Sequence, residues 1–261
     1  AAGSGESEIR RWLLESDLVD AIVGLPTDMF YNTGIATYIW ILDNAKPAHR
    51  VGKVQLVDGT AFYEKMRKNL GDKSREVTEP HRNTIVELYD AYADGEHSRT
   101  FTTDAFGYWT ITLDRPMRRN YSAVRLDAVE DKKFGKGADV DAFRAAIAGM
   151  NQAVYKNRDD FVADLREAVV GVGLTMTPAQ YRTLALALSE VDETADLVVD
   201  AKGRPEMDPA LRDTENVPFT YGGNTDGADA RDAVVKTYVE AEVLPHVPDA
   251  VWDESKTKVG Y

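Results

Sequence analysis

The apolar positions at the start of the chain predict a helix and two strands in direct succession. Residues 6–16 place their apolar side chains on one face, as in an amphipathic helix. Residues 18–25 are rich in Val, Ile and Leu and end at Pro26, which predicts a strand buried on both faces. Residues 36–42 predict a second strand, and the short connection makes the two strands antiparallel neighbours. This pattern indicates an α/β sheet.

The middle of the chain alternates between strand-like and helix-like patterns. We expect a third strand over 53–57, helices over 60–70 and 78–92, and a hairpin over 101–113. Thr78 is the expected N-cap of the second helix, because Glu79 and Pro80 occupy its first turn.

From Asp139 onward the pattern becomes helical. It predicts helices over 140–150, 158–170 and 178–188, with Thr177 as the cap of the third. Residues 202–227 are rich in Gly, Pro, Asp and Asn and predict a long irregular segment. A final helix is expected over 228–244.

Composition narrows the chemistry that the chain can carry. The 261 residues are 43% hydrophobic and contain no cysteine, so a core is possible but disulfides, thiolate metal sites and cysteine nucleophiles are excluded. The four histidines form no HxH or HExxH pattern, and we expect no metal site. No long apolar run or signal core is present, so we expect no membrane contact and a cytoplasmic location.

Charge is distributed unevenly along the chain. The net charge is −13, which argues against general nucleic-acid binding, whereas residues 46–136 carry 17 basic and 14 acidic side chains. Lys65, Arg67 and Lys68 are candidates for contact with DNA phosphates, or they form a solvated helix face. Arg118 and Arg119, next to Arg115, either bind phosphate or pair with carboxylates.

The loop after the first strand has the sequence DMFYNTG. Asn and Gly are ordinary turn residues, so the loop can be a simple hairpin connection. Phe30 and Tyr31 are nevertheless adjacent aromatics beside Asn32, and exposed aromatic rings are stabilised by a flat partner such as a base. Both interpretations stay open on the residues alone.

Several blocks of sequence resemble one family. The blocks are SGESEIRRWLLESDLVDAIVGLPTDMFYNTGIATYIWIL, GKVQLVDGTAFYEKMRKNLGDK, DAFGYWTITLDRPMRRNY, RDTENVPF and EVLPHVPDAVWDESKTKVGY. Together they resemble the modification subunit of type I restriction-modification systems, an adenine-N6 DNA methyltransferase. The resemblance implies an α/β fold: the C-terminal part of a Rossmann-like S-adenosylmethionine-dependent methyltransferase sheet, followed by a mostly helical region.

The resemblance also implies functional roles for particular residues. Methyl transfer from S-adenosylmethionine would go to an adenine flipped out of the duplex, with Phe30 stacking on that base and Tyr31 and Asn32 shaping its pocket. Residues 1–126 would be the C-terminal part of the catalytic domain, and residues 127–261 a helical region with an acidic irregular segment. DNA, a specificity subunit and a restriction subunit would be its partners.

Two motifs of that family are absent from the sequence. Neither an Asn/Asp-Pro-Pro-Phe/Tyr motif nor a glycine-rich loop after a strand occurs. We therefore expect a fragment that begins after the cofactor and catalytic motifs, binds S-adenosylmethionine weakly or not at all, is inactive alone and needs the missing N-terminal half. The helix face of Ile9, Trp12 and Leu13 and the first strand should lack parallel-sheet neighbours and form an apolar edge. The alternative is a non-catalytic interaction module that docks partner subunits.

Overall fold

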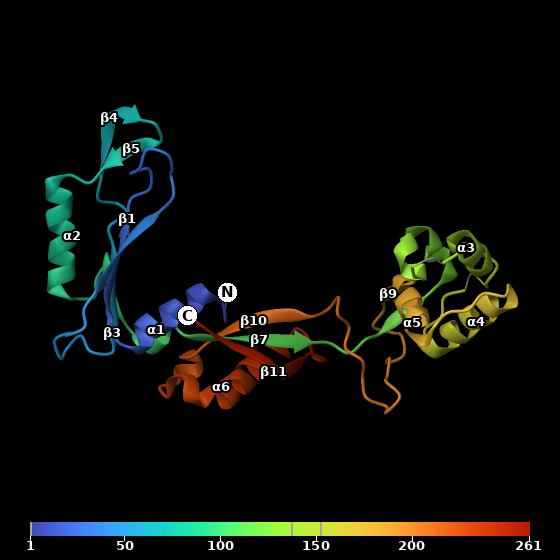
Figure 1. Cartoon of the computed structure of the whole chain (residues 1–261). Helices are drawn as coiled ribbons and strands as arrows, with labels where there is room; N and C mark the ends of the chain where they lie inside the picture. The colour runs from blue at the N-terminus through green and yellow to red at the C-terminus, as the bar shows by residue number, and fades with distance from the viewer. Residues whose placement is uncertain (1, 137, 152) are drawn as a thin grey trace. The chain divides into compact units, whose positions relative to one another are not determined.

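The computed structural model describes residues 2–136, 138–151 and 153–261 (Figure 1). These residues form two compact units, which are described separately. Unit 1 consists of Ala1–Thr112, Thr214–His246 and Asp253–Tyr261, and unit 2 consists of Leu113–Asp213 and Val247–Trp252. No helix in the described ranges is long and apolar enough to cross a membrane.

A four-stranded mixed sheet forms the N-terminal part of unit 1. It contains β1 (Val19–Leu25), β2 (Thr37–Leu42), β3 (Lys53–Asp58) and β6 (Ser98–Thr102), in the order β2-β1-β3-β6. β1 is antiparallel to β2 and parallel to β3. The antiparallel pair and the mixed α/β character are therefore confirmed, while the Rossmann-like arrangement stays a prediction. The expectation that the first strand lacks parallel neighbours is wrong, since β3 fills that place.

Helix α2 (Glu79–Ala91) covers one face of this sheet (Figure 1). The Gln55 side chain on β3 donates a hydrogen bond to the carbonyl oxygen of Leu88 at 2.9 Å. The helix begins after Thr78 as expected, but the Thr78 hydroxyl is bonded to the His81 ring and not to the helix backbone. Among the residues that the structure describes, no helix covers the opposite face of the sheet (Figure 1).

Helix α1 (Gly5–Glu15) is held by the C-terminal residue. Arg10 donates to the backbone oxygen of Tyr261 at 2.7 Å, and the Ser7 hydroxyl accepts from the Tyr261 amide at 3.1 Å. Ile9 and Trp12 are 61% and 62% exposed. The predicted helix is confirmed, and so is its exposed apolar face at these two residues.

The helix expected over residues 60–70 is wrong. The chain instead forms a hairpin of β4 (Glu64–Leu70) and β5 (Lys73–Glu76). Phe62, Met66 and Leu70 recur every four residues, which imitates a helical face, but Gly71 has a positive φ of 62° and turns the chain back. An added Cβ at Gly71 would lie 2.5 Å from the carbonyl oxygen of Tyr31, so only glycine fits there.

The hairpin expected over residues 101–113 is also wrong. β6 pairs with β3, whereas β7 (Tyr108–Asp114) lies in a second sheet between β10 (Asp213–Pro218) and β11 (Val251–Gly260). The strand β10 also interrupts the irregular segment expected over 202–227. Trp109 packs on Phe219 with ring centroids 4.4 Å apart, so residues distant in sequence decide this sheet.

A shorter helix than expected closes unit 1. Helix α6 (Arg231–Tyr238) continues into a π-helical turn over Val239–Val243, which together match most of the predicted helix over 228–244. Val235 of α6 is fully buried, whereas Val234, Val239 and Val243 are almost fully buried.

Unit 2 is built on three helices that the periodicity predicts. They are α3 (Val140–Ala148), α4 (Arg158–Gly171) and α5 (Pro178–Ala187). The Thr177 cap is confirmed, because its hydroxyl accepts from the Gln180 amide and the Gln180 side chain bonds back to the Thr177 amide. A short sheet of β8 (Arg119–Tyr121) and β9 (Ser189–Val191) joins them.

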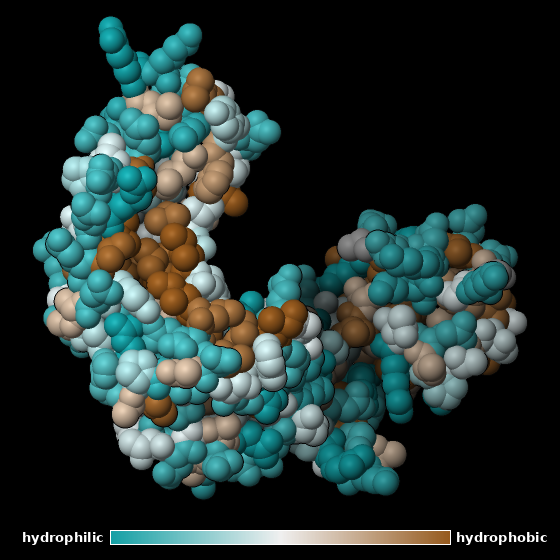
Figure 2. All heavy atoms as spheres, turned by 60° about the vertical axis from the view of Figure 1, so that its left-hand side comes forward, coloured by the Kyte–Doolittle hydropathy of each residue, from teal (hydrophilic) through white to brown (hydrophobic). Residues whose placement is uncertain are grey.

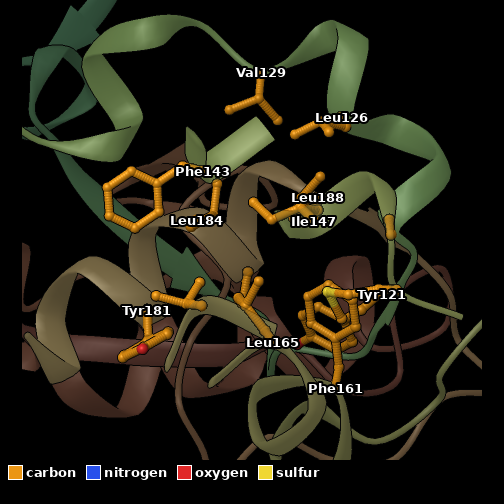
Figure 3. Close-up of a cluster of buried hydrophobic side chains, with 14 of the residues drawn as sticks. Tyr121, Leu126, Val129, Phe143, Ile147, Phe161, Leu165, Tyr181, Leu184 and Leu188 are labelled. Atoms are coloured by element: carbon orange, nitrogen blue, oxygen red, sulfur yellow. The ribbon is translucent and has the colours of Figure 1, made fainter. Parts of the chain in front are cut away.

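The hydrophobic core of unit 2 is shielded from solvent. Phe161, Leu165 and Leu184 are fully buried and point toward one another from α4 and α5 (Figure 3). Tyr121 stacks on Phe161 with ring centroids 5.6 Å apart, and its burial raises the pKa of its hydroxyl to about 12. The expected boundary of a catalytic domain at residue 126 stays a prediction.

Candidate nucleic-acid interface

The loop between β1 and β2 presents two aromatic side chains to solvent. Phe30 and Thr33 form an isolated antiparallel bridge, which leaves Tyr31 and Asn32 at the tip of a tight turn. Phe30 is 47% exposed and Tyr31 is 60% exposed. The three residues predicted to meet a target base therefore lie together, and both rings are accessible to a flat partner.

The base of this loop has a constrained backbone. Asp28 adopts a positive φ of 60°, which is unusual for a residue other than glycine. The Thr27 hydroxyl donates to the Asp28 carboxylate at 3.0 Å. A Cβ at Gly34 would lie 2.7 Å from Oδ1 of Asp28, so glycine lets the two ends of the loop approach.

The β4–β5 hairpin holds the loop from behind. The amides of Ser74 and Arg75 donate to the carbonyl oxygen of Asp28 at 3.0 and 3.2 Å, and the Asp72 amide donates to the carbonyl oxygen of Tyr31 at 2.9 Å. Sequence reasoning missed this support, and the only local signal for it was Gly71-Asp72 at a turn between two polar runs.

Arg75 connects the hairpin to the loop through its side chain. Its Nη1 donates to the Thr27 hydroxyl at 2.8 Å, and its Nε lies 3.7 Å from the Asp28 carboxylate. The guanidinium also lies over the ring of Tyr63, 4.3 Å from its centroid. The Arg75 side chain therefore holds Thr27 and Asp28 of the loop and also stacks on Tyr63, which lies just before β4.

The predicted phosphate contacts fall into two groups. Lys65, Arg67 and Lys68 are exposed on β4, close in sequence to the hairpin residues that hold the loop. Beside them an open hollow of about 660 Å³ is lined by Thr27, Thr60, Ala61, Tyr63, Lys65 and Arg75. The structure thus brings Lys65 to the base of the loop, although on a strand and not on a helix.

Arg118 and Arg119 belong to unit 2 and have protein partners. Arg119 forms two hydrogen bonds to the Asp208 carboxylate, at 2.6 and 2.9 Å, in a buried pair. Burial opposes ionisation of Asp208, but the hydrogen bonds from Arg119 and the Ala210 amide lower its pKa. Arg118 donates to the carbonyl oxygen of Ala195. Carboxylate pairing is therefore what Arg119 does here, and DNA contact by Arg118 and Arg119 stays a prediction.

The uncovered face of the unit 1 sheet is largely apolar. Ile22, Tyr38, Leu56 and Phe101 line an open cleft of about 510 Å³ on it, with Asp58 at one end. Hydrogen bonds from the Thr60 side chain and amide lower the pKa of Asp58. Hydrophobic side chains gather in a band on this unit in Figure 2. Strand β2 forms the edge, with Tyr38, Ile39 and Leu42 at least half exposed.

Metal and cofactor sites are not evident in the described ranges. No group of three His, Asp or Glu side chains in them is placed to hold a metal ion. Gly171 and Gly173 lie at the end of α4, and Gly3 and Gly5 lie at the start of α1. Neither glycine pair follows a strand, so neither forms the phosphate-type cradle of a nucleotide cofactor.

Comparison with known proteins places the loop and the hairpin in a matched segment. Residues 1–115 match the family described as N-6 DNA Methylase. The chain is 32% identical over 121 residues to the type I restriction enzyme MjaIX methylase subunit of Methanocaldococcus jannaschii, covering 46% of this chain and 21% of that protein. It is 31% identical over 94 residues to the MjaVII methylase subunit of the same organism, covering 36% and 16%.

A solved structure gives a weaker match. The methyltransferase subunit of a type I restriction-modification system from Streptococcus thermophilus is 26% identical, with 40% of this chain and 21% of that chain covered and a TM-score of 0.35. The matched part of the chain spans about a fifth of the length of the MjaIX relative. The resemblance to type I modification subunits that the sequence predicts is confirmed.

Proposed function

From the N-6 DNA methylase match of residues 1–115, we propose that this chain supplies the target-base side of a DNA adenine-N6 methyltransferase of a type I restriction-modification system. One observation carries the proposal. The loop with Phe30, Tyr31 and Asn32 presents its rings to solvent and is held rigidly by the hairpin behind it. Rigid, exposed aromatic rings suit a base that has left its stack.

The physical role of Phe30 is stacking. A base that has flipped out of the duplex loses its neighbours, and an aromatic face restores about 1–3 kcal/mol of the lost stacking. A phenyl ring has neither an acidic proton nor a basic atom, so Phe30 holds the base without taking part in proton transfer. Tyr31 and Asn32 at the tip bound the pocket and offer hydrogen-bonding groups to its rim.

S-adenosylmethionine supplies the methyl group in this reaction. We assign no cofactor contact to this chain, because neither Gly3 and Gly5 nor Gly171 and Gly173 follow a strand. The groups that polarise the adenine amino nitrogen also lie outside these 261 residues, because the Asn/Asp-Pro-Pro-Phe/Tyr motif does not occur in them. The proposed reaction therefore requires a segment that carries both motifs, and these 261 residues alone are inactive.

The exposed β2 edge is the proposed docking place for the segment that carries those motifs. Tyr38, Ile39 and Leu42 leave apolar surface on a strand that has β1 on one side only, so a further strand can extend the sheet. The specificity subunit and the restriction subunit complete the proposed complex, and the specificity subunit selects the DNA sequence.

Complementation tests the proposal. The 261-residue chain is mixed with a polypeptide bearing the glycine-rich loop and the Asn/Asp-Pro-Pro-Phe/Tyr motif from the coding sequence upstream of Ala1, and with a specificity subunit. Methylation of duplex DNA should appear only in the mixture. Methyl transfer by the chain alone, or none in a mixture that assembles, would contradict the proposal.

Phe30→Ala examines the stacking role in the same assay. The substitution should lower duplex methylation about tenfold while cofactor affinity changes little, because a loss of roughly 1–3 kcal/mol falls on the bound base alone. Val86→Ala on α2 is the matched control, since Val86 is similarly exposed on the same unit. Equal losses of methylation and of cofactor affinity would count against base stacking.

A further inference from the structure

The β4–β5 hairpin concentrates positive charge in an acidic protein. Between Glu64 and Glu76 the chain has five basic and three acidic residues, whereas the whole chain carries a net charge of −13. The basic residues are Lys65, Arg67, Lys68, Lys73 and Arg75. Such a local excess attracts a polyanion at short range, where salt does not fully screen it.

The basic side chains of β4 form no ion pairs within the part of the chain that the structure describes. In the described residues, Lys65, Arg67 and Lys68 have no carboxylate within 4.0 Å, and all three side chains are exposed. The arginines of unit 2 behave differently, since Arg115 pairs with Asp249 and Arg119 pairs with Asp208. Unpaired exposed cations on one strand are available for phosphates, which bind them with the release of counterions.

The shape of the hairpin also suits binding to duplex DNA. A two-stranded ribbon can follow the DNA backbone or enter the major groove. Arg67 and Lys68 are adjacent on β4, where the register with β5 shifts between Lys65 and Leu70, and both side chains are exposed. Both exposed cations are therefore available to the phosphates of a duplex that approaches the ribbon.

Contact at the hairpin would be transmitted to the aromatic loop. Three backbone hydrogen bonds run from Asp72, Ser74 and Arg75 to the carbonyl oxygens of Asp28 and Tyr31. The Arg75 side chain adds the bond to Thr27 and the approach to Asp28. A shift of the hairpin cannot occur without a shift of the loop unless these bonds break.

We infer that the β4–β5 hairpin is a DNA arm whose Arg67 and Lys68 bind phosphates next to the target nucleotide, and that Arg75 is a positioning residue that sets the aromatic loop against the base. The inference rests on the proposed function for the identity of the base. The phosphate contacts themselves require only duplex DNA.

Salt dependence of DNA binding tests the phosphate contacts on the 261-residue chain. The chain should bind a short fluorescent duplex at low salt, with log K falling linearly as log salt rises. Arg67→Gln with Lys68→Gln should lower the steepness by about 1.8, since each lost phosphate contact removes about 0.9. The paired variant Lys202→Gln with Lys236→Gln removes two exposed charges outside the hairpin and should leave the slope unchanged.

A charge-preserving exchange separates charge from folding. Arg67→Lys with Lys68→Arg keeps both cations and should keep the slope of the unmodified chain. No duplex binding at low salt, or an unchanged slope after Arg67→Gln with Lys68→Gln, would overturn the inference. A slope that also falls in the charge-preserving variant would overturn it too.

Arg75→Met tests the positioning role in the complemented enzyme. Methionine retains an apolar stem over Tyr63 but cannot bond Thr27 or Asp28. The turnover number should fall about tenfold with little change in the KM for duplex, because misplacement of a bound group affects the reacting geometry. Arg75→Lys should recover part of the loss. A rise in KM without a fall in turnover would overturn the positioning role.

The inference about the hairpin and the proposed function can fail independently of each other. Salt-dependent binding needs no cofactor and no methyl transfer, so the hairpin result stands even if complementation yields no methylation. Conversely, methylation that depends on Phe30 but not on Arg67 and Lys68 would retain the proposed function and discard the arm.

Discussion

The two units of this chain both bury an apolar core, but they differ in the large apolar side chains that they expose. Unit 2 buries Phe161, Leu165 and Leu184 completely in one core (Figure 3). Unit 1 leaves Trp12 on α1 and Tyr38 on β2 mostly exposed. Contiguous exposed apolar surface marks a place for a partner. The exposed large apolar side chains of unit 2 are aliphatic, whereas the exposed aromatic rings all lie in unit 1, which indicates that unit 1 presents surfaces to other molecules.

Charged side chains repeat the contrast. Unit 2 pairs Arg115 and Arg119 with carboxylates, whereas unit 1 exposes Arg67 and Lys68 without such pairs in the described ranges. A buried pair is part of the fold, and an unpaired exposed cation is available for a ligand. Buried pairs such as Arg119–Asp208 in unit 2 and Arg50–Asp20 in unit 1 should therefore contribute to stability, and the exposed cations of the hairpin to binding.

The largest expected loss of stability is in the unit 2 core. Phe161→Ala should lower the free energy of unfolding by about 4 kcal/mol, because it removes a fully buried ring that contacts Tyr121 and Tyr155 and leaves a cavity. Val172→Ala, at an exposed position after α4, should change it by less than about 0.5 kcal/mol. Denaturant titration measures the free energy of unfolding of both variants. Similar losses for Phe161→Ala and Val172→Ala would contradict the importance of the unit 2 core.

The Arg119–Asp208 pair should give the next largest effect. Asp208→Asn should cost about 3 kcal/mol, because it leaves the Arg119 charge buried without its counterion. The folded-state pKa of Asp208 is lowered, so the pair stabilises the protein above about pH 4 and this contribution is lost as pH falls through the folded pKa.

Unfolding measured between neutral and acid pH checks this prediction. The unmodified chain should lose stability as pH falls through the titration range of Asp208, and Asp208→Asn should lose less. Glu167→Gln is the control, because that carboxylate is exposed on α4 in the same unit. Identical acid profiles for the Asp208 variant and the unmodified chain would refute the role of the pair.

A substitution on β2 should have the smallest effect on stability. Ile39→Thr keeps strand propensity and alters a side chain that is half exposed, so the free energy of unfolding should change by less than about 1 kcal/mol. Association with the complementing polypeptide should weaken measurably, as sedimentation would show. A large loss of stability with intact association would place Ile39 in a core and not on a docking edge.

Local patterns predicted the parts of the fold that depend on neighbours in sequence. The helices α3, α4 and α5 follow from apolar periodicity and caps such as Thr177, and the β1–β2 pair follows from a short connection. The hairpin β4–β5 was missed because Phe62, Met66 and Leu70 mimic helical spacing. The sheet of β7, β10 and β11 joins distant segments, which no local period can indicate.

Only part of the candidate site could be predicted from the sequence. Phe30, Tyr31 and Asn32 are recognisable as an unusual loop, and Lys65, Arg67 and Lys68 as a basic run. The role of Arg75 depends on contacts with Thr27 and Tyr63, which become neighbours only in the folded chain. The partner of Arg119 lies 89 positions away, so charge pattern alone left its role open.

Photochemical cross-linking tests the central claim most directly. A duplex with 5-iodouracil in place of the target adenine is bound to the complemented complex, irradiated and digested, and the modified peptide is sequenced by mass spectrometry. An adduct on Phe30 or Tyr31 is expected, and it should disappear when the iodinated base is moved to a neighbouring position. An adduct confined to residues outside the loop between β1 and β2 would contradict it.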